Sequence, residues 1–222
     1  MTLLGLDTST SAASACVLRA DGEWFEVAPP PERLGRPPAH ASELMPAVAD
    51  VMSRADVGWA DLDAIAVGVG PGMFTGLRIG IATARALAVA NGLPLRPVSS
   101  LAALAAGIEA PLRLPLVDAR RGEVFGALYD GDERVWPPFA RPPEELVGCL
   151  RDHGFTPLAA GDGSVRFREV LEAAGVQVEP DDSEAHVVRA LHVCRLGAEA
   201  EDRPPETVLP DYLRKPDAKP QQ

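Results

Sequence analysis

This chain of 222 residues carries one order of predicted elements twice, namely three strands, a helix, a strand and a helix. Asp7 and Asp118 each end a short apolar run, and each is followed by an Asp-Gly pair that favours a tight hairpin turn, Asp21-Gly22 and Asp130-Gly131. The two pairs of positions lie 111 and 109 residues apart, which indicates an internal duplication. The predicted elements are strands at 2–6, 14–19, 23–28 and 62–68 with helices at 42–56 and 75–90 in the first copy, and strands at 113–117, 123–129, 133–136 and 156–160 with helices from 143 and 165 in the second.

The duplicated order predicts an α/β fold of two tandem βββαβα units. Each unit holds a mixed sheet with helices on its faces, which is the actin-like or Hsp70-like ATPase architecture, ribonuclease H-like in its topology. We expect the first unit to span 1–98 and the second 99–222. Pro46 is expected in the first turn of the first long helix, where a missing N–H is tolerated. A further helix is predicted at 183–200, and packing back on the first unit is one place for it.

Composition narrows the class of protein. There are 21 basic and 32 acidic residues, a formal net charge of −11, so the chain is a poor autonomous binder of nucleic acid. Its three cysteines have no CxxC spacing, which favours reduced thiols and no metal site. The charge-free stretch at 64–77 is too short and too broken by glycine and proline for a membrane span. The opening residues lack a basic segment before the apolar run, so we expect a cytoplasmic protein.

Two segments have the composition of a phosphate site. Asp7-Thr8-Ser9-Thr10 sets a carboxylate and hydroxyls at the end of a strand, where open α/β sheets bind ligands, but the same residues also form ordinary polar turns. The segment 68–80 is a strand, a glycine-rich turn with Gly70 and Gly72, and a helix start. It matches neither GxGxxG nor a lysine-bearing phosphate loop, so a turn that packs helix on sheet competes with anion binding.

The helix at 75–90 is apolar around nearly its whole circumference. Such a helix is normally buried on more than one side, and its own sheet covers only one. Either another part of the monomer or a partner protein covers the rest. For the partner alternative, the candidate contact residues are Thr75, Gly76, Arg78, Ile79, Ala82, Thr83 and Ala86.

Two further segments carry polar residues with more than one interpretation. His40 enters the first long helix, and the positions three and four residues later are Glu43 and Leu44, so a capping or hydrogen-bonding role is favoured over metal binding. The segment 118–123, with Asp118 and Arg120, is either an ion-paired turn or a contact for a charged ligand.

Several motifs together resemble the TsaB proteins, also called YeaZ, over nearly the whole chain. The long glycine segment is the most specific of them, and Met73 stands where the family usually has serine. The motifs are Leu6-Asp7-Thr8-Ser9-Thr10; His40-Ala41-Ser42-Glu43-Leu44-Met45-Pro46; Gly70-Pro71-Gly72-Met73-Phe74-Thr75-Gly76-Leu77-Arg78-Ile79-Gly80; Val117-Asp118-Ala119-Arg120 with Gly122-Glu123-Val124; and Pro210-Asp211-Tyr212-Leu213-Arg214.

This resemblance implies an actin-like fold and a role in making N6-threonylcarbamoyladenosine next to the anticodon of tRNA. It implies a noncatalytic subunit that pairs through its first unit with the transferase TsaD, which performs the transfer, while the ATPase TsaE joins them. It implies no catalytic residue, metal or resident cofactor in this chain, and tRNA contact only within the complex. Weak ATP or ADP binding, a homodimeric nucleotide-binding module, and a free-standing ATP-dependent transferase or peptidase are the alternatives.

Overall fold

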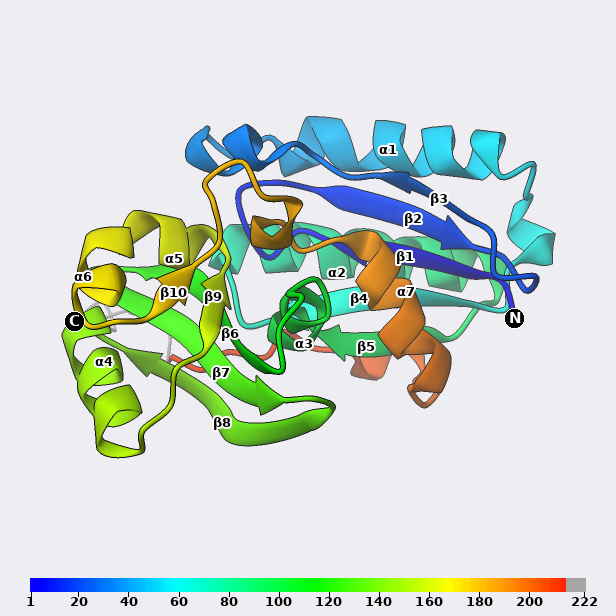
Figure 1. Ribbon diagram of the computed structural model, residues 1–222. Coiled ribbons are helices and arrows are strands. Elements are labelled where there is room, and N and C mark those ends of the chain that lie inside the picture. The colour runs from blue at the N-terminus through cyan, green and yellow to red at the C-terminus, as the bar shows by residue number, and fades with distance from the viewer. Residues whose placement is uncertain (215–222) are drawn as a thin grey trace, which may run out of the picture.

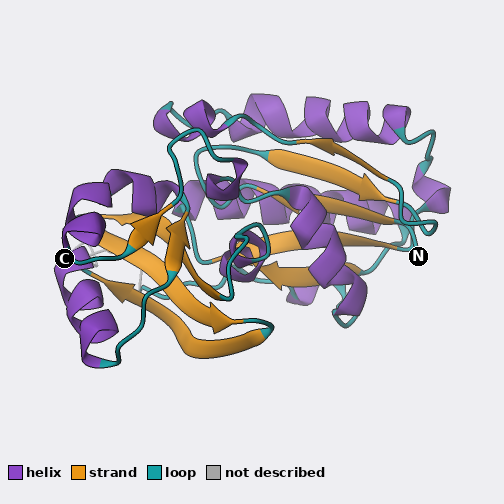
Figure 2. Ribbon diagram, viewed as in Figure 1, coloured by secondary structure: helices purple, strands orange, loops and turns teal. Residues whose placement is uncertain are grey.

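The computed structural model describes residues 1–214, which form two sheets with helices against them (Figures 1 and 2). The elements in chain order are β1 (Leu3–Asp7), β2 (Ser14–Leu18), β3 (Trp24–Val27), α1 (His40–Arg54), β4 (Ala64–Gly70), α2 (Phe74–Asn91), β5 (Leu95–Ser99), α3 (Ser100–Ala105), β6 (Leu112–Arg120), β7 (Glu123–Asp130), β8 (Glu133–Arg141), α4 (Pro143–Asp152), β9 (Leu158–Ala160), α5 (Asp162–Arg166), α6 (Arg168–Ala173), β10 (Gln177–Val178) and α7 (Ala190–Glu199). Short 3-10 turns lie at η1 (Pro31–Gly35), η2 (Trp59–Asp61), η3 (Glu184–His186) and η4 (Pro205–Thr207).

The two sheets have the same topology. Their orders are β3-β2-β1-β4-β5 and β10-β9-β6-β7-β8, each with five strands. In the first, β1 pairs antiparallel with β2 and parallel with β4; in the second, β6 pairs antiparallel with β7 and parallel with β9. The predicted fold is therefore confirmed: an α/β protein of two actin-like units. β5, α3 and β10 were not among the predicted elements, and β5 and β10 are the last strands of their sheets.

Both faces of the first sheet are covered by helices. Strand residues alternate between faces, so Leu4 and Leu6 lie in the core shared with α1 and α2, while Leu3 and Cys16 lie in the cluster with α7. α7 comes close because Gly5 has no side chain: a Cβ there would overlap the Cys194 thiol. Figure 1 shows α7 in orange lying across the first sheet. A third cluster, with Leu101, Val117 and Val193, fills the space between the units.

Three local expectations were wrong. α1 begins at His40, so Pro46 lies inside the helix and not in its first turn. The segment predicted as a helix from 183 forms a 3-10 turn capped by Ser183, then extended buried residues, and α7 begins only at Ala190, because His186 is held in the interior by backbone hydrogen bonds. The helix predicted from 165 begins at Asp162 and is divided at Phe167 into α5 and α6.

Candidate functional site

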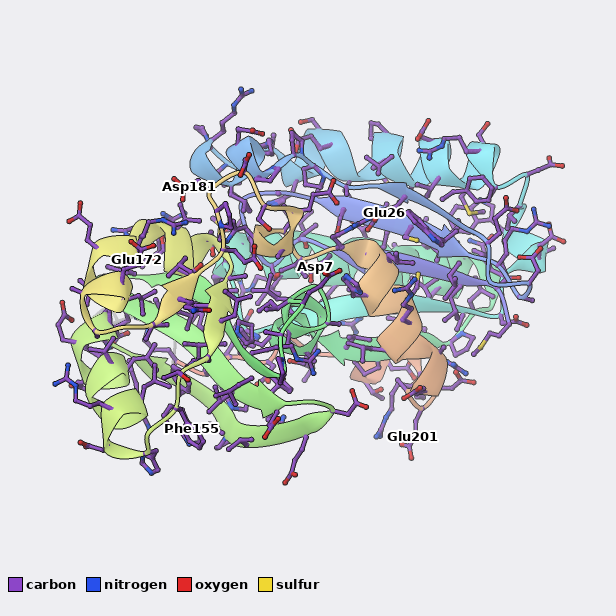
Figure 3. All side chains as sticks on the ribbon, viewed as in Figure 1. Asp7, Glu26, Phe155, Glu172, Asp181 and Glu201 are labelled. Carbon is purple, nitrogen blue, oxygen red and sulfur yellow. The ribbon has the colours of Figure 1, made fainter. Side chains whose placement is uncertain are left out.

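The Asp7 carboxylate lies in the interior at the end of β1 (Figure 3). Its Oδ1 accepts hydrogen bonds from the Ser9 amide (2.8 Å) and the Ser9 hydroxyl (2.6 Å), and its Oδ2 accepts from the Ser100 hydroxyl (2.8 Å). Burial raises the pKa of Asp7 against the lowering effect of these bonds. The carboxylate therefore accepts hydrogen bonds within its own turn and joins that turn to α3.

The glycines of the segment 68–80 bring α2 against this turn. A Cβ on Gly72 would overlap the Ser9 carbonyl oxygen, and one on Gly76 or Gly80 would overlap Thr8. Thr8 itself is buried, and its hydroxyl donates to the Gly76 carbonyl oxygen at 2.8 Å. The space beside these glycines is filled by the Asp7 turn, so the absence of a side chain is what allows the close packing. This favours a turn that packs helix on sheet over one that binds an anion.

The two segments are hydrogen-bonded to each other where a nucleotide phosphate would lie between them. Three amides of these segments already have partners within the protein: Ser9 N–H donates to Asp7, Met73 N–H to the Ser9 carbonyl oxygen (2.6 Å) and Gly70 N–H to the Ser100 hydroxyl (3.2 Å). The residues from Asp7 to Ser11 are all buried. A phosphate would have to break these bonds and separate α2 from the Asp7 turn.

The connection between β3 and α1 covers the same turn from outside. The Ser11 hydroxyl donates to the Leu34 carbonyl oxygen at 2.7 Å, and the buried His40 ring donates from Nε2 to the Thr10 carbonyl oxygen at 2.7 Å. The Arg33 guanidinium, bound to Glu43 at 3.0 Å, fixes the connection to α1. His40 thus has the hydrogen-bonding role favoured by the sequence. Glu43 helps to hold the connection between β3 and α1 over the Asp7 turn.

The turn after β6 is the counterpart of the Asp7 turn in the second unit. Asp118 is buried, and its Oδ2 pairs with Arg166 at 2.7 Å and with Arg120 at 3.2 Å. Its amide donates to Oδ1 of Asp162 at 2.9 Å. Of the two interpretations left open by the sequence, the geometry is that of an ion-paired turn. A cavity of about 630 Å³ in this region, lined by Arg36, Arg120 and Asp162, separates it from the covering connection.

Asp162 makes stability depend on pH. Burial raises the pKa of its carboxyl from 3.8 to about 6, and the nearby Asp118 adds to the rise. The folded chain then keeps this proton to a higher pH than the unfolded chain does. The free energy of unfolding therefore falls as the pH rises from about 4 to about 6, where the folded chain has to ionise a buried carboxyl.

We therefore expect Asp162→Asn to stabilise the protein at pH 7, by about 1–3 kcal/mol, because the amide oxygen still accepts from Asp118 and no charge is buried. At pH 4 the variant and the wild type should unfold at nearly the same urea concentration. Asp181→Asn, at an exposed carboxyl, is the control and should show no such pH-dependent gain. Equal gains at pH 4 and pH 7 would contradict the assignment.

α2 carries the residues considered as a partner surface. Thr75, Ala82 and Ala86 are exposed, and Ile79 and Thr83 are half-buried on the same side. Gly76 is different, since it is buried against Thr8. We call the strip Thr75, Ile79, Ala82, Thr83 and Ala86 the α2 face. Val89, 70% exposed, continues the apolar surface toward the end of the helix.

The flanks of the α2 face are built by the chain itself. On one side, a hollow of about 450 Å³ lies between the start of α1 and the residues Thr75 and Ile79. On the other, Phe74 stacks on Tyr212, and the Arg78 guanidinium donates to the Tyr212 hydroxyl at 3.0 Å. Part of the apolar helix is therefore covered within the monomer, by residues near the end of the described chain. Arg78 already has a partner there.

Some residues that build this region were missed from the sequence. Ser100 anchors Asp7, and His186 accepts from the Gly161 amide through Nδ1 (3.0 Å) and donates through Nε2 to the Pro180 carbonyl oxygen (2.9 Å). Neither lies in a recognisable motif. Tyr212 and Arg214 do belong to the motif at 210–214, but the sequence of this motif gives no sign that Tyr212 packs against α2.

Comparisons with known proteins find related sequences and structures. A TsaB protein of Bacillus subtilis is 31% identical, over 96% of this chain and 94% of its own length. The structure of YeaZ from Pseudomonas aeruginosa has a TM-score of 0.81 and 32% identity, over 96% of this chain and 99% of that one. The chain belongs to the TsaB family.

Other matches extend the TsaB family relationship. A TsaB protein of Haemophilus influenzae is 35% identical over 78% of this chain and 76% of its own length. Like the Bacillus protein, it is named a tRNA threonylcarbamoyladenosine biosynthesis protein. The family model described as TsaD, tRNA N6-adenosine threonylcarbamoyltransferase, matches residues 31–136, which include α1, α2 and the turn after β6. Over these residues the chain is thus similar to the transferase family.

Within residues 1–214, no group of three histidine, cysteine or acidic side chains is arranged to hold a metal ion. The same residues contain no helix with the length and apolarity to cross a membrane.

We expect the isolated protein to show negligible ATP hydrolysis and no stoichiometric transition metal. The reason is the occupied phosphate position, together with the lack of a lysine-bearing phosphate loop in the sequence. Phosphate release and elemental analysis are the measurements, with Asp7→Asn as the comparison. Turnover that Asp7→Asn removes, or a firmly bound zinc or iron, would contradict the expectation.

Proposed function

We propose that this chain is a noncatalytic subunit required for threonylcarbamoyl transfer to the adenosine next to the anticodon of tRNA. In this proposal it acts in the cytoplasm, binds the transferase TsaD through the α2 face and is joined by TsaE. Two observations carry the proposal together. The Asp7 turn and the glycine turn are hydrogen-bonded to each other where a phosphate would lie, and α2 presents an exposed strip of mostly small residues. Small side chains let a second helix approach closely, and the helix has no polar side chain there to desolvate except threonine hydroxyls.

The charge of the chain supports contact with tRNA only within a complex. At −11, few tRNA phosphates can be neutralised by the subunit alone. The alternative of an independent hydrolase has little geometric support. Ser164 and His186 come within 3.5 Å of each other, but both are fully buried, and the serine hydroxyl donates to the Gly161 carbonyl oxygen at 2.8 Å. A peptide substrate has no access to that pair.

Reconstitution with purified components tests the proposal. TsaD and TsaE with tRNA, ATP and threonylcarbamoyl-adenylate as the donor should modify tRNA only when this chain is added. Sedimentation should show a complex of this chain with TsaD, and filter binding of the chain alone to tRNA should be weak at ~150 mM salt. Full modification without the chain would overturn the proposal. A homodimer that excludes TsaD would favour the homodimeric alternative.

A further inference from the structure

The stretch 203–214, here called the strap, begins on the first unit. Arg203 and Leu95 exchange backbone hydrogen bonds of 2.8 and 3.0 Å at the edge of β5. Farther along, the Arg85 guanidinium donates to the Glu206 carbonyl oxygen at 3.0 Å, and Val208 is buried in the core beneath α2. The first half of the strap therefore belongs to the first unit.

The middle of the strap crosses the glycine turn and the first turn of α2. The Asp211 amide donates to the Val69 carbonyl oxygen at 2.8 Å. The Tyr212 ring lies on Phe74, with ring centroids 5.3 Å apart, and the Arg78 guanidinium carbon lies 3.8 Å from the centroid of the Phe74 ring. Both aromatic rings keep more than a third of their surface exposed, so this contact forms the edge of the α2 face.

The last described residue of the strap reaches the second unit. The Arg214 guanidinium donates to the Glu123 carboxylate at 2.7 Å and to the Ala119 carbonyl oxygen at 2.9 Å, in the turn between β6 and β7. Leu213 packs against the apolar cluster between the units. In Figure 1 the strap, coloured red, runs from the first unit toward the second. It thus connects the glycine turn of the first unit with the turn after β6 in the second, which is the counterpart of the Asp7 turn.

We propose that the strap fixes the angle between the two units. Two units of one chain move relative to each other by default unless a large hydrophobic interface holds them. Here the apolar cluster with Leu101, Val117 and Val193 joins the units in their interior, and the strap adds a second tie between the glycine turn and the turn after β6. Because it is held by Phe74 and Arg78, it also links that angle to the α2 face. This last link rests on the proposed function, whereas the tie between the units does not.

The test compares two arginines of the strap. Arg214→Ala removes the contacts with Glu123 and Ala119. Arg203→Ala removes the same charge, but among residues 1–214 the Arg203 side chain pairs only with the exposed Glu201, and its backbone bonds to Leu95 remain. Spin labels at Ala49→Cys in α1 and Ala173→Cys in α6, both exposed, report the distance between the units in a Cys149→Ser background. Amide hydrogen exchange reports the Asp211–Val69 bond.

In Arg214→Ala we expect a broader distribution of label distances and about tenfold faster exchange of the Asp211 amide, because a charge-assisted hydrogen bond that closes the strap is lost. Tyr212→Ala, which removes the stack on Phe74, should do the same, and Arg203→Ala should match the wild type. Unchanged distances in Arg214→Ala and Tyr212→Ala, or equal broadening in Arg203→Ala, would overturn the proposal. All of these measurements use the isolated chain, so failure of TsaD binding would count against the proposed function and not against the strap.

Discussion

Ala82→Glu and Ala86→Glu are each expected to abolish binding to TsaD and to reduce tRNA modification to the level seen without this chain. Both alanines are exposed on α2, one turn apart, in the centre of the α2 face. A glutamate there would have to be desolvated without a partner when a second helix packs on the face, at a cost of several kcal/mol. A loss of about 3 kcal/mol already weakens binding more than 100-fold.

The fold of these variants should be intact, because an exposed alanine in the middle of a helix tolerates glutamate within about 0.5 kcal/mol. Ala49→Glu is the matched control: it makes the same change at an exposed position in the middle of α1. Sedimentation with TsaD and the reconstituted modification assay provide the measurements, with circular dichroism to check folding. If Ala82→Glu and Ala86→Glu behave like Ala49→Glu, the α2 face is ordinary surface.

The fold was predictable because its signals are local and repeated. Asp-Gly turns, strands that end in Asp7 and Asp118, and the helix stop at Gly92, where φ is +67°, each depend on a few neighbouring residues. β10 was missed because two residues carry no usable periodicity. The helix start at Ala190 was missed because it is set by His186, whose partners Gly161 and Pro180 come from a distant turn and from the preceding loop.

The candidate site was predictable as a set of residues and not as an arrangement. The sequence indicated Asp7, Thr8 and the glycines, and left open whether they hold an anion or pack together. The answer depends on contacts across about 70 positions, such as Thr8 with Gly76, which no local pattern encodes. The strap shows the same limit: Tyr212 and Arg78 are 134 positions apart, and their contact changes what the surface of α2 offers to a partner.

Glu26→Ala is expected to lower the free energy of unfolding by about 3–5 kcal/mol, the cost of breaking a buried ion pair. The Glu26 side chain is 1% exposed, and its Oε2 accepts from two nitrogens of Arg189, at 2.9 and 2.5 Å. Its Oε1 accepts from the Leu191 amide at 2.9 Å, in the first turn of α7. The carboxylate therefore joins β3 to α7 and satisfies a helix-end amide at the same time.

Glu184→Ala is the matched control for this prediction. Glu184 pairs with the same arginine at 3.0 Å, but its side chain is 75% exposed, and such pairs contribute about 1 kcal/mol or less. Urea unfolding at pH 7 should therefore separate the two variants by at least about 2 kcal/mol. Because α7 covers the face of the first sheet opposite to α2, Glu26→Ala should destabilise the chain without altering the α2 face. Its folded fraction should bind TsaD as the wild type does, whereas equal unfolding midpoints for Glu26→Ala and Glu184→Ala would show that the buried carboxylate is not what holds α7 on the sheet.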